Sequence, residues 1–306
     1  MNARATAPST SQDYGRGLAA ASIAFFAWGL LPLYLKALQA VPVLQVTAHR
    51  MMWGCLFAIG WLAVRGELGQ VGAALADPKR RLRLLATAVF ISTNWLVYVW
   101  AIINDRAVEA SLGYFINPLL NVLMGVFVLS ERLNRAQWTA VGIAAVSVVY
   151  LTWSVGHPPW IALILAFSFC MYGLLRKVVT VEALPGFAAE TLLVLPIGVG
   201  YLLWCEATGV GALGNASLGT NLLLALGGPV TALPLVLFAY GARRIPYSTV
   251  GLLQYIGPTI QLILAVFAFH EPFERSRALG FALIWLAIAI YLGDGLWRAR
   301  KTRMLQ

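Results

Sequence analysis

Charged residues are scarce in this chain, and their scarcity excludes most soluble folds. Lysine, arginine, aspartate and glutamate make up 11% of the 306 residues, whereas 60% are hydrophobic. A soluble globular domain carries roughly 25% charged residues, and the mean hydropathy here is +0.78. The composition predicts an all-α membrane protein embedded in the lipid bilayer.

Other absences narrow the chemistry. The three cysteines, Cys55, Cys170 and Cys205, are scattered and odd in number, so neither a disulfide framework nor a metal site is indicated. The chain has no Walker motif, which argues against ATP-driven work, and no cofactor is expected. The net charge of +10 would suit nucleic acid only if the basic residues formed one soluble patch, so no nucleic-acid partner is expected.

Apolar stretches fill nearly the whole chain. Each runs for about 18 to 23 residues, enough to cross a hydrocarbon core ~30 Å thick. Breaks at charges, prolines and glycines divide them into ten predicted transmembrane helices: 17–36, 43–64, 84–103, 108–129, 136–154, 159–176, 183–204, 219–241, 247–269 and 278–297. Pro32 and Pro196 interrupt the first and the seventh.

The basic residues predict the orientation of these helices. With the N-terminus inside, 17 of the 22 lysines and arginines fall on cytoplasmic segments, including the tails 1–16 and 298–306. Only Lys36, Arg106, Arg275 and Arg277 fall on the outer side, and Arg50 lies within a span. Cytoplasmic loops are enriched in lysine and arginine, so we expect a multi-pass protein of the cell inner (plasma) membrane with both termini cytoplasmic.

One motif occurs twice. NPLLNVLMGVFVLSERL starts at Asn117 and GPTIQLILAVFAFHEPF starts at Gly257, with Pro118 and Pro258 each thirteen residues before Glu131 and Glu271. The motif predicts two repeats of five helices, 17–154 and 158–297. Because five is odd, the second repeat is inverted, which places a substrate site near the midplane between the halves in many transporters.

The motifs resemble a known family. Glu109–Pro118 (EASLGYFINP) and Gln254–Pro258 (QYIGP) are similar to the RarD branch of the EamA family, in the drug/metabolite transporter superfamily. Further matching pieces are Trp28-Gly29, Thr47-Ala48-His49-Arg50, Asn94-Trp95, Ala166–Phe169, Arg176-Lys177 and Trp285. The resemblance covers nearly the whole chain. It implies a secondary transporter, usually an exporter of small metabolites or drugs, whose cavity is lined by helices other than the fifth and tenth.

Polar residues at membrane depth are the candidate site. His49 and Arg50 lie about one-third of the way into the second span, where a charge is by default a functional-site hypothesis. Arg50 could instead fix helix packing through a salt bridge or carbonyl contacts. Glu190 is the carboxylate well inside a span. Glu190 and His49 are the candidates for proton coupling, against structural roles as an ion pair and as a neutral packing residue.

Amides and aromatic residues complete the predicted substrate cavity. Asn117 and Asn121 share one helical face, as do Asn94 and Tyr98 on the preceding span. The remaining candidates are Trp95, Tyr114, Gln254, Tyr255 and Gln261. A polar stripe in a membrane helix serves either as interhelical contact or as a ligand site. The repeated Pro118, Glu131, Pro258 and Glu271 are interpreted as structural, with each proline a hinge or a static kink.

Three function classes fit a polytopic membrane protein. A permease for a small molecule is favoured by the repeats and the buried polar groups, with an amino-acid-like, aromatic or chloramphenicol-like substrate. An intramembrane enzyme would need a nucleophile and base, or a metal cluster, at one depth, so no enzyme is expected. A regulatory or structural membrane protein is the alternative. A homo-oligomer is compatible with each of them.

Overall fold

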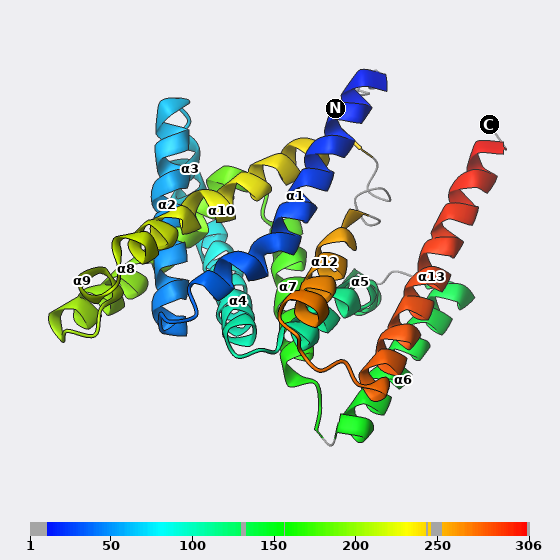
Figure 1. The fold of residues 1–306 in the computed structure, drawn as a ribbon. Coiled ribbons are helices and arrows are strands. Elements are labelled where there is room, and N and C mark those ends of the chain that lie inside the picture. The colour runs from blue at the N-terminus through cyan, green and yellow to red at the C-terminus, as the bar shows by residue number, and fades with distance from the viewer. Residues whose placement is uncertain (1–10, 130–132, 156, 243, 246–252, 305–306) are drawn as a thin grey trace, which may run out of the picture.

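The computed structural model describes residues 11–129, 133–155, 157–242, 244–245 and 253–304, and within them it holds helices and no strand. The helices run in the following order (Figure 1): α1 Ser11–Ala37, α2 Val43–Val64, α3 Gly69–Ala76, α4 Pro78–Ile103, α5 Ala107–Leu129, α6 Arg135–Val155, α7 Trp160–Val178, α8 Ala183–Ala207, α9 Ala212–Asn215, α10 Leu218–Ala242, α12 Ile256–Ile263, the π-helix η1 Leu264–Ala268 and α13 Arg275–Met304.

Nine of the ten predicted spans fall on the longer helices, and the ninth in chain order, 247–269, falls in part on α12 with η1, whereas its residues 247–252 lie outside the described residues. A chain in hydrocarbon has to satisfy its backbone groups internally, and a helix does so within one segment. Local signals fix some of the ends. At the start of α4, Asp77 accepts a hydrogen bond from the Lys79 amide at 3.1 Å and Pro78 occupies the first position. Beyond α2, Gly66 adopts a φ of 68° that glycine tolerates.

In the part of the chain that the structure describes, fewer than ten helices are long and apolar enough to cross a membrane. Within the described residues, five segments qualify: Asp13–Ala37, Pro78–Ile103, Arg135–Trp153, Ala183–Ala207 and Leu218–Gly241. The pair α2 and α3, bent by 118°, is a sixth if it counts as one span. The apolar parts of α7 and of α12 with η1 are shorter. The chain is therefore an all-helical membrane protein, and the ten crossings stay a prediction.

The outer surface of the helices is strongly apolar. Val64, Trp153, Ile197 and Trp204 are exposed by 60% or more of their surface, and many other large hydrophobic side chains are exposed along the helices. Water-soluble monomers rarely show extended apolar surface. This surface fits contact with lipid tails.

The pairing of the helices follows a regular scheme. If the predicted halves are matched in chain order, α1, α2, α4, α5 and α6 correspond to α7, α8, α10, α12 and α13. The contact of α1 with α10 then has its counterpart in α7 with α4, that of α1 with α12 in α7 with α5, and that of α2 with α10 in α8 with α4. When the two halves are exchanged, three further pairs are unchanged: α2 with α8, α5 with α12 and α6 with α13.

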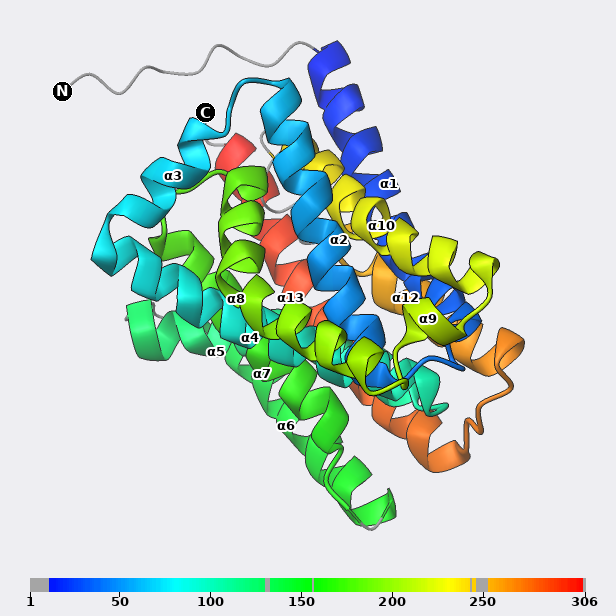
Figure 2. The same cartoon turned by 90° about the vertical axis from the view of Figure 1, so that its left-hand side faces the viewer.

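Two further features concern the ends and edges of the molecule. Helices α6 and α13 run side by side along one edge (Figure 1). The N-terminal end of α1 and the C-terminal end of α13 lie toward the same end of the molecule in both views (Figures 1 and 2). A chain whose ends lie on one side of a membrane crosses it an even number of times.

Glycines allow close approach where these helices cross. A Cβ on Gly228 of α10 would lie 2.5 Å from the carbonyl oxygen of Trp53, and one on Gly113 of α5 would lie 2.7 Å from that of Ala162. Small residues at such crossings let membrane helices pack backbone to backbone. The contacts between α2 and α10 and between α5 and α7 depend on them.

Some elements were not predicted from the sequence. The short helices α3 and α9 lie in expected loops, and η1 replaces α-helix after α12. Helices α1 and α8 run through Pro32 and Pro196 without ending. Pro258 lies in the first turn of α12, where an N–H has no intrahelical acceptor, so proline is tolerated there.

Candidate functional site

Arg50 lies at the centre of the best-buried polar cluster. It belongs to α2 and is 2% exposed. Its Nη2 is 3.4 Å from the Thr231 hydroxyl on α10, and its guanidinium carbon is 5.3 Å from the ring centre of Trp95 on α4. Nε and Nη1 have no hydrogen-bond partner within the described part of the chain. The cation is held by a ring and one long hydrogen bond.

Three tyrosines surround this guanidinium. The groups that interact with it electrostatically are the hydroxyls of Tyr34, Tyr98 and Tyr114, from α1, α4 and α5. The Tyr34 hydroxyl donates to the Leu223 carbonyl at 3.1 Å. The Tyr98 hydroxyl is buried and has no partner among the residues described. Elements of both predicted halves therefore meet at Arg50.

Asn94 joins three helices. Its amide nitrogen donates to the Leu165 carbonyl and to the Ser168 hydroxyl of α7, both at 3.0 Å, and its oxygen accepts from the Tyr114 hydroxyl at 3.0 Å. The ring of Tyr114 also packs on that of Tyr98 at 5.7 Å. These hydrogen bonds join different helices, and interhelical contact is one of the two roles that the sequence leaves open for the amides.

Glu190 has a cationic neighbour. Its Oε1 lies 3.5 Å from Nη1 of Arg176 on α7, and its Oε2 accepts from the Tyr172 hydroxyl at 3.4 Å. Arg176 also donates to the carbonyls of Val181 and Glu182. Glu190 itself is 1% exposed. The geometry is that of a loose ion pair, and it leaves open whether the carboxylate takes part in proton transfer.

A small cavity links the neighbourhoods of Arg50 and Glu190. It lies between α2, α4 and α8, and Trp95 and Glu190 both line it. The other lining residues are Met51, Ala88, Ile91, Ser92, Phe187, Thr191 and Val194. Arg50 does not line the cavity itself but contacts the ring of Trp95. The cavity is largely apolar, with one acidic group.

Within the described residues, His49 makes no hydrogen bond to the Arg50 cluster. It is fully buried on α2, and neither ring nitrogen has a hydrogen-bond partner in the described residues. The charged group that acts on it is Glu206 of α8. Glu206 accepts hydrogen bonds from the amides of Leu213 and Gly214 at 2.9 Å. The structure thus places His49 and Glu190 in different surroundings.

The remaining predicted cavity residues lie nearer α12. Gln261 donates to the Trp28 carbonyl at 3.2 Å, and the ring of Tyr255 stacks on Phe115. Asn117 is buried with its side-chain oxygen unpartnered in the described residues, and Gln254 is half-buried before α12. The side chains of Pro118 and Asn121, and residue Glu131, lie outside the described residues. Among the described residues, none of this group lines the cavity between α2, α4 and α8, so a shared substrate cavity with Arg50 stays a prediction.

Glu271 connects the two predicted halves. Its carboxylate accepts hydrogen bonds from the amides of Ala107 and Val108, at 2.7 and 2.9 Å, and so caps the N-terminus of α5. Burial raises the pKa of the Glu271 carboxyl, while these two amides lower it. The sequence predicted that Glu271 lies at the outer end of a repeat. It did not predict that the carboxylate would contact α5.

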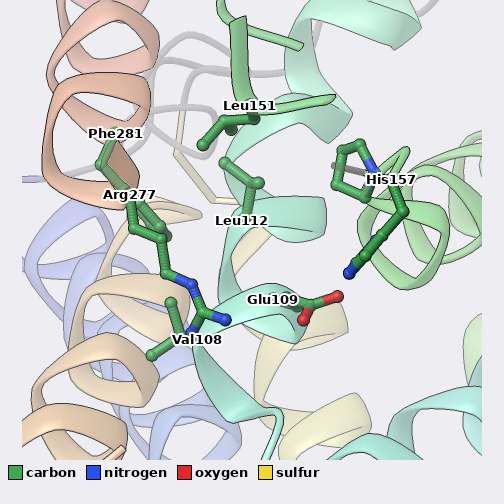
Figure 3. A pocket seen from close by; sticks show the side chains of 8 residues that line it. Val108, Glu109, Leu112, Leu151, His157, Arg277 and Phe281 are labelled. Atoms are coloured by element: carbon green, nitrogen blue, oxygen red, sulfur yellow. The ribbon is translucent and has the colours of Figure 1, made fainter. Parts of the chain in front are cut away.

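A second pocket opens at the ends of α5, α6, α7 and α13 (Figure 3). Glu109 lies between Arg277 and His157 in this view, and the apolar side chains of Leu112 and Phe281 lie above it. Glu109 is already paired with Arg106 through Oε1, at 2.5 Å. The pocket is separate from the buried cluster.

Comparison with known proteins decides the family. The model of the EamA-like transporter family matches residues 15–153, the first predicted half. A protein named RarD from Streptomyces exfoliatus is 45% identical over 92% of this chain and 89% of its own length. The chain belongs to the EamA-like transporter family. Within this family, an uncharacterized transporter, YojE of Bacillus subtilis, is 43% identical over 90% of this chain and 93% of its length.

Two further proteins are similar to this chain at lower identity. A Pseudomonas aeruginosa protein named chloramphenicol-sensitive protein RarD is 29% identical over 94% of this chain and 97% of its own. A solved crystal structure is similar in fold to this chain, with a TM-score of 0.57 and 22% identity, and the match covers 90% of this chain and 97% of that one.

Sequence reasoning missed several residues of the buried cluster. Tyr34 and Thr231 are common residue types in membrane helices, and the packing of α10 against both α1 and α2 brings them to Arg50. Arg176 was counted among the cytoplasmic charges, although a cation within reach of a helix interior could have been considered as the partner of Glu190. Polarity at depth identified Arg50, Asn94 and Glu190.

Proposed function

We propose that this chain is a secondary active transporter of a small molecule. In this proposal ten transmembrane helices form two inverted repeats, 17–154 and 158–297, in the cell inner membrane. The tails 1–16 and 298–306 are cytoplasmic. The pairing scheme of the helices supports the repeats because exchanging the halves reproduces it. The ends of α1 and α13 on one side support an even number of crossings.

The observation that carries the proposal is the buried polar cluster between the halves. Arg50 meets Thr231 of the second half, and Trp95 and Glu190 line one cavity from different halves. Charged groups at membrane depth are costly and in membrane proteins mark substrate or ion pathways. A protein that served only as a membrane scaffold could be held together by apolar packing alone, without buried charges.

Proton coupling is the second part of the proposal. Glu190 is the first candidate, because its carboxylate lines the cavity and forms a loose ion pair with Arg176. A proton arriving on Glu190 would release that attraction and change how α7 and α8 are held together. His49, buried beside Glu206, is the other candidate.

The direction of transport is proposed to be export, as the family resemblance implies. The substrate is proposed to be an amino-acid-like, aromatic or chloramphenicol-like compound. The aromatic walls at Trp95 and Phe187 support a flat apolar moiety. The name of the Pseudomonas aeruginosa relative supports chloramphenicol as a first compound to try.

Transport by the purified protein tests this function. The protein is reconstituted in proteoliposomes, and release of preloaded radiolabelled amino acids, aromatic acids and chloramphenicol is measured with and without a pH gradient. We expect protein-dependent release of at least one compound, accelerated by the gradient. No release of any compound by folded protein would favour a regulatory or structural role.

A further inference from the structure

The charge of Arg50 is not offset within the protein. Among the described residues, no carboxylate oxygen lies within 4.0 Å of its nitrogens, and the ion pairs that occur there involve other cations. Its one hydrogen bond, to Thr231, is long at 3.4 Å. Two of its three nitrogens are buried without a partner in the part of the chain described. A cation left in this state is destabilising unless another molecule supplies the negative charge.

The groups around Arg50 favour an anion with oxygen acceptors. A guanidinium presents its N–H groups as a planar fork that matches a carboxylate. The Tyr98 hydroxyl interacts with the same guanidinium and is also unpartnered in the described residues, so it offers a further donor. The hydroxyls of Tyr34 and Tyr114 donate to other acceptors, the Leu223 carbonyl and the Asn94 side chain.

We propose that Arg50 binds the carboxylate of a small, amphipathic, singly charged substrate. This inference rests on the proposed function and specifies its substrate class. Only one cation is uncompensated at the site, so a monoanion neutralises it. A phosphate monoester, at about −1.5 to −2 near pH 7, would bring excess negative charge into a site where Glu190 already lines the adjoining cavity.

The adjoining cavity offers an apolar lining for the rest of the substrate, and its volume of about 10 Å³, room for about one water molecule, has to grow when the substrate binds. Met51, Ile91, Phe187 and Val194 line that cavity, and the ring of Trp95 lies at its boundary with Arg50. The substrate would place its carboxylate toward Arg50 and its apolar body away from it. The indole of Trp95 shifts to let the carboxylate reach the guanidinium. Glu190 at the cavity wall disfavours a second negative charge.

Thermal stabilisation of the purified protein by matched ligands tests the inference. The probes are benzoate, phenylpropionate and isocaproate, each compared with its neutral amide, together with phenyl phosphate. We expect at least one carboxylate to stabilise the wild-type protein, and its amide to bind about 10- to 100-fold more weakly, because a charge-assisted hydrogen-bonded pair is lost. Arg50→Met should bind the acid and its amide equally.

The variants also separate ligand binding from a structural role. Without ligand, Arg50→Met should melt at or above the wild-type temperature, because an uncompensated buried charge is removed. Arg275→Gln, at an exposed arginine, should keep the wild-type preference for the acid. The inference is overturned if no carboxylate stabilises the wild-type protein, if acid and amide bind alike, if phenyl phosphate binds best, or if Arg50→Met melts well below wild type.

These outcomes are distinguishable from failure of the proposed function. If no carboxylate stabilises the wild-type protein but that protein still releases chloramphenicol, a compound without a carboxylate, the chain is a transporter and only the carboxylate site is wrong. If the wild-type protein binds carboxylates but releases no compound, the binding site stands without transport.

Discussion

At the scale of single residues, Glu190 carries the coupling hypothesis. Its carboxylate lies 3.5 Å from Arg176 and 3.4 Å from the Tyr172 hydroxyl, both long distances, and the Thr87 side chain also interacts with it. A group that takes up and releases a proton during transport needs surroundings that tolerate both charge states. The loose contacts are compatible with this requirement.

The variant Glu190→Gln tests the coupling role. The amide keeps the shape of the side chain but cannot titrate, so we expect substrate binding to persist while acceleration of transport by a pH gradient is lost. Transport is measured in proteoliposomes with and without the gradient. His49→Gln is the matched variant at the other candidate. Gradient-driven transport that persists in Glu190→Gln rules out this residue, and loss in His49→Gln alone assigns the proton there.

Glu271 is a residue with a structural role that can be measured. Replacing the carboxylate by an amide in Glu271→Gln leaves one acceptor for the two amides that start α5. We expect a loss of about 1 kcal/mol in stability, the size of a typical helix cap, seen as a lower melting temperature in detergent. Glu274→Gln, at an exposed position three residues on, should change little. Equal melting of both variants would contradict the cap.

At the scale of helices, the contact of α2 with α10 depends on glycine. A Cβ on Gly228 would lie 2.5 Å from the Trp53 carbonyl oxygen, and backbone of a packed helix cannot move aside cheaply. We expect Gly228→Ala to destabilise the protein by about 1 to 3 kcal/mol, as overpacking does. Gly60→Ala is the control, because no atom lies within 4 Å of its Cβ, and it should be neutral or stabilising. Thermal unfolding that ranks the two variants in the opposite order would refute this packing.

The helices were largely predictable because apolar length alone determines them. Spans such as 43–64 and 183–204 begin where α2 and α8 begin. The short helices α3 and α9 were not predicted because neither is long enough to produce an apolar stretch that stands out in the sequence. The π-turns of η1 depend on packing against α5 and α12, which sequence periodicity does not encode.

The candidate site was predictable only in part, for a similar reason. Arg50 and Glu190 are conspicuous because charge is rare at membrane depth. The hydrogen bonds of Asn94 to Ser168 and of Arg50 to Thr231 depend on which helices are in contact. The sequence alone does not predict these helix contacts. Gln254, Tyr255 and Gln261 were grouped with Arg50 by polarity, whereas the structure places them around α12, against Phe115 and Trp28.

At the scale of the whole molecule, the inverted repeat makes a prediction about sidedness. Residue 72 on α3 and residue 157 before α7 are exposed, and an odd number of predicted spans separates them. Cysteines at Gly72→Cys and His157→Cys, in a chain whose native cysteines are replaced, should react with a membrane-impermeant thiol reagent from opposite sides. Reaction from the same side would refute the ten-helix topology.

The central claim is that the cavity between α2, α4 and α8 is a substrate path open in turn to each side of the membrane. Ser92 lines this cavity, while Val89 on the same helix is 54% exposed on the apolar surface. The most direct measurement is reaction of Ser92→Cys with an impermeant thiol reagent, in right-side-out and in inside-out vesicles, with Val89→Cys as control. We expect Ser92→Cys to react from both sides, with transported substrate slowing the reaction, and Val89→Cys to react from neither. Reaction of Ser92→Cys from one side only, or from neither in folded protein, would contradict the account.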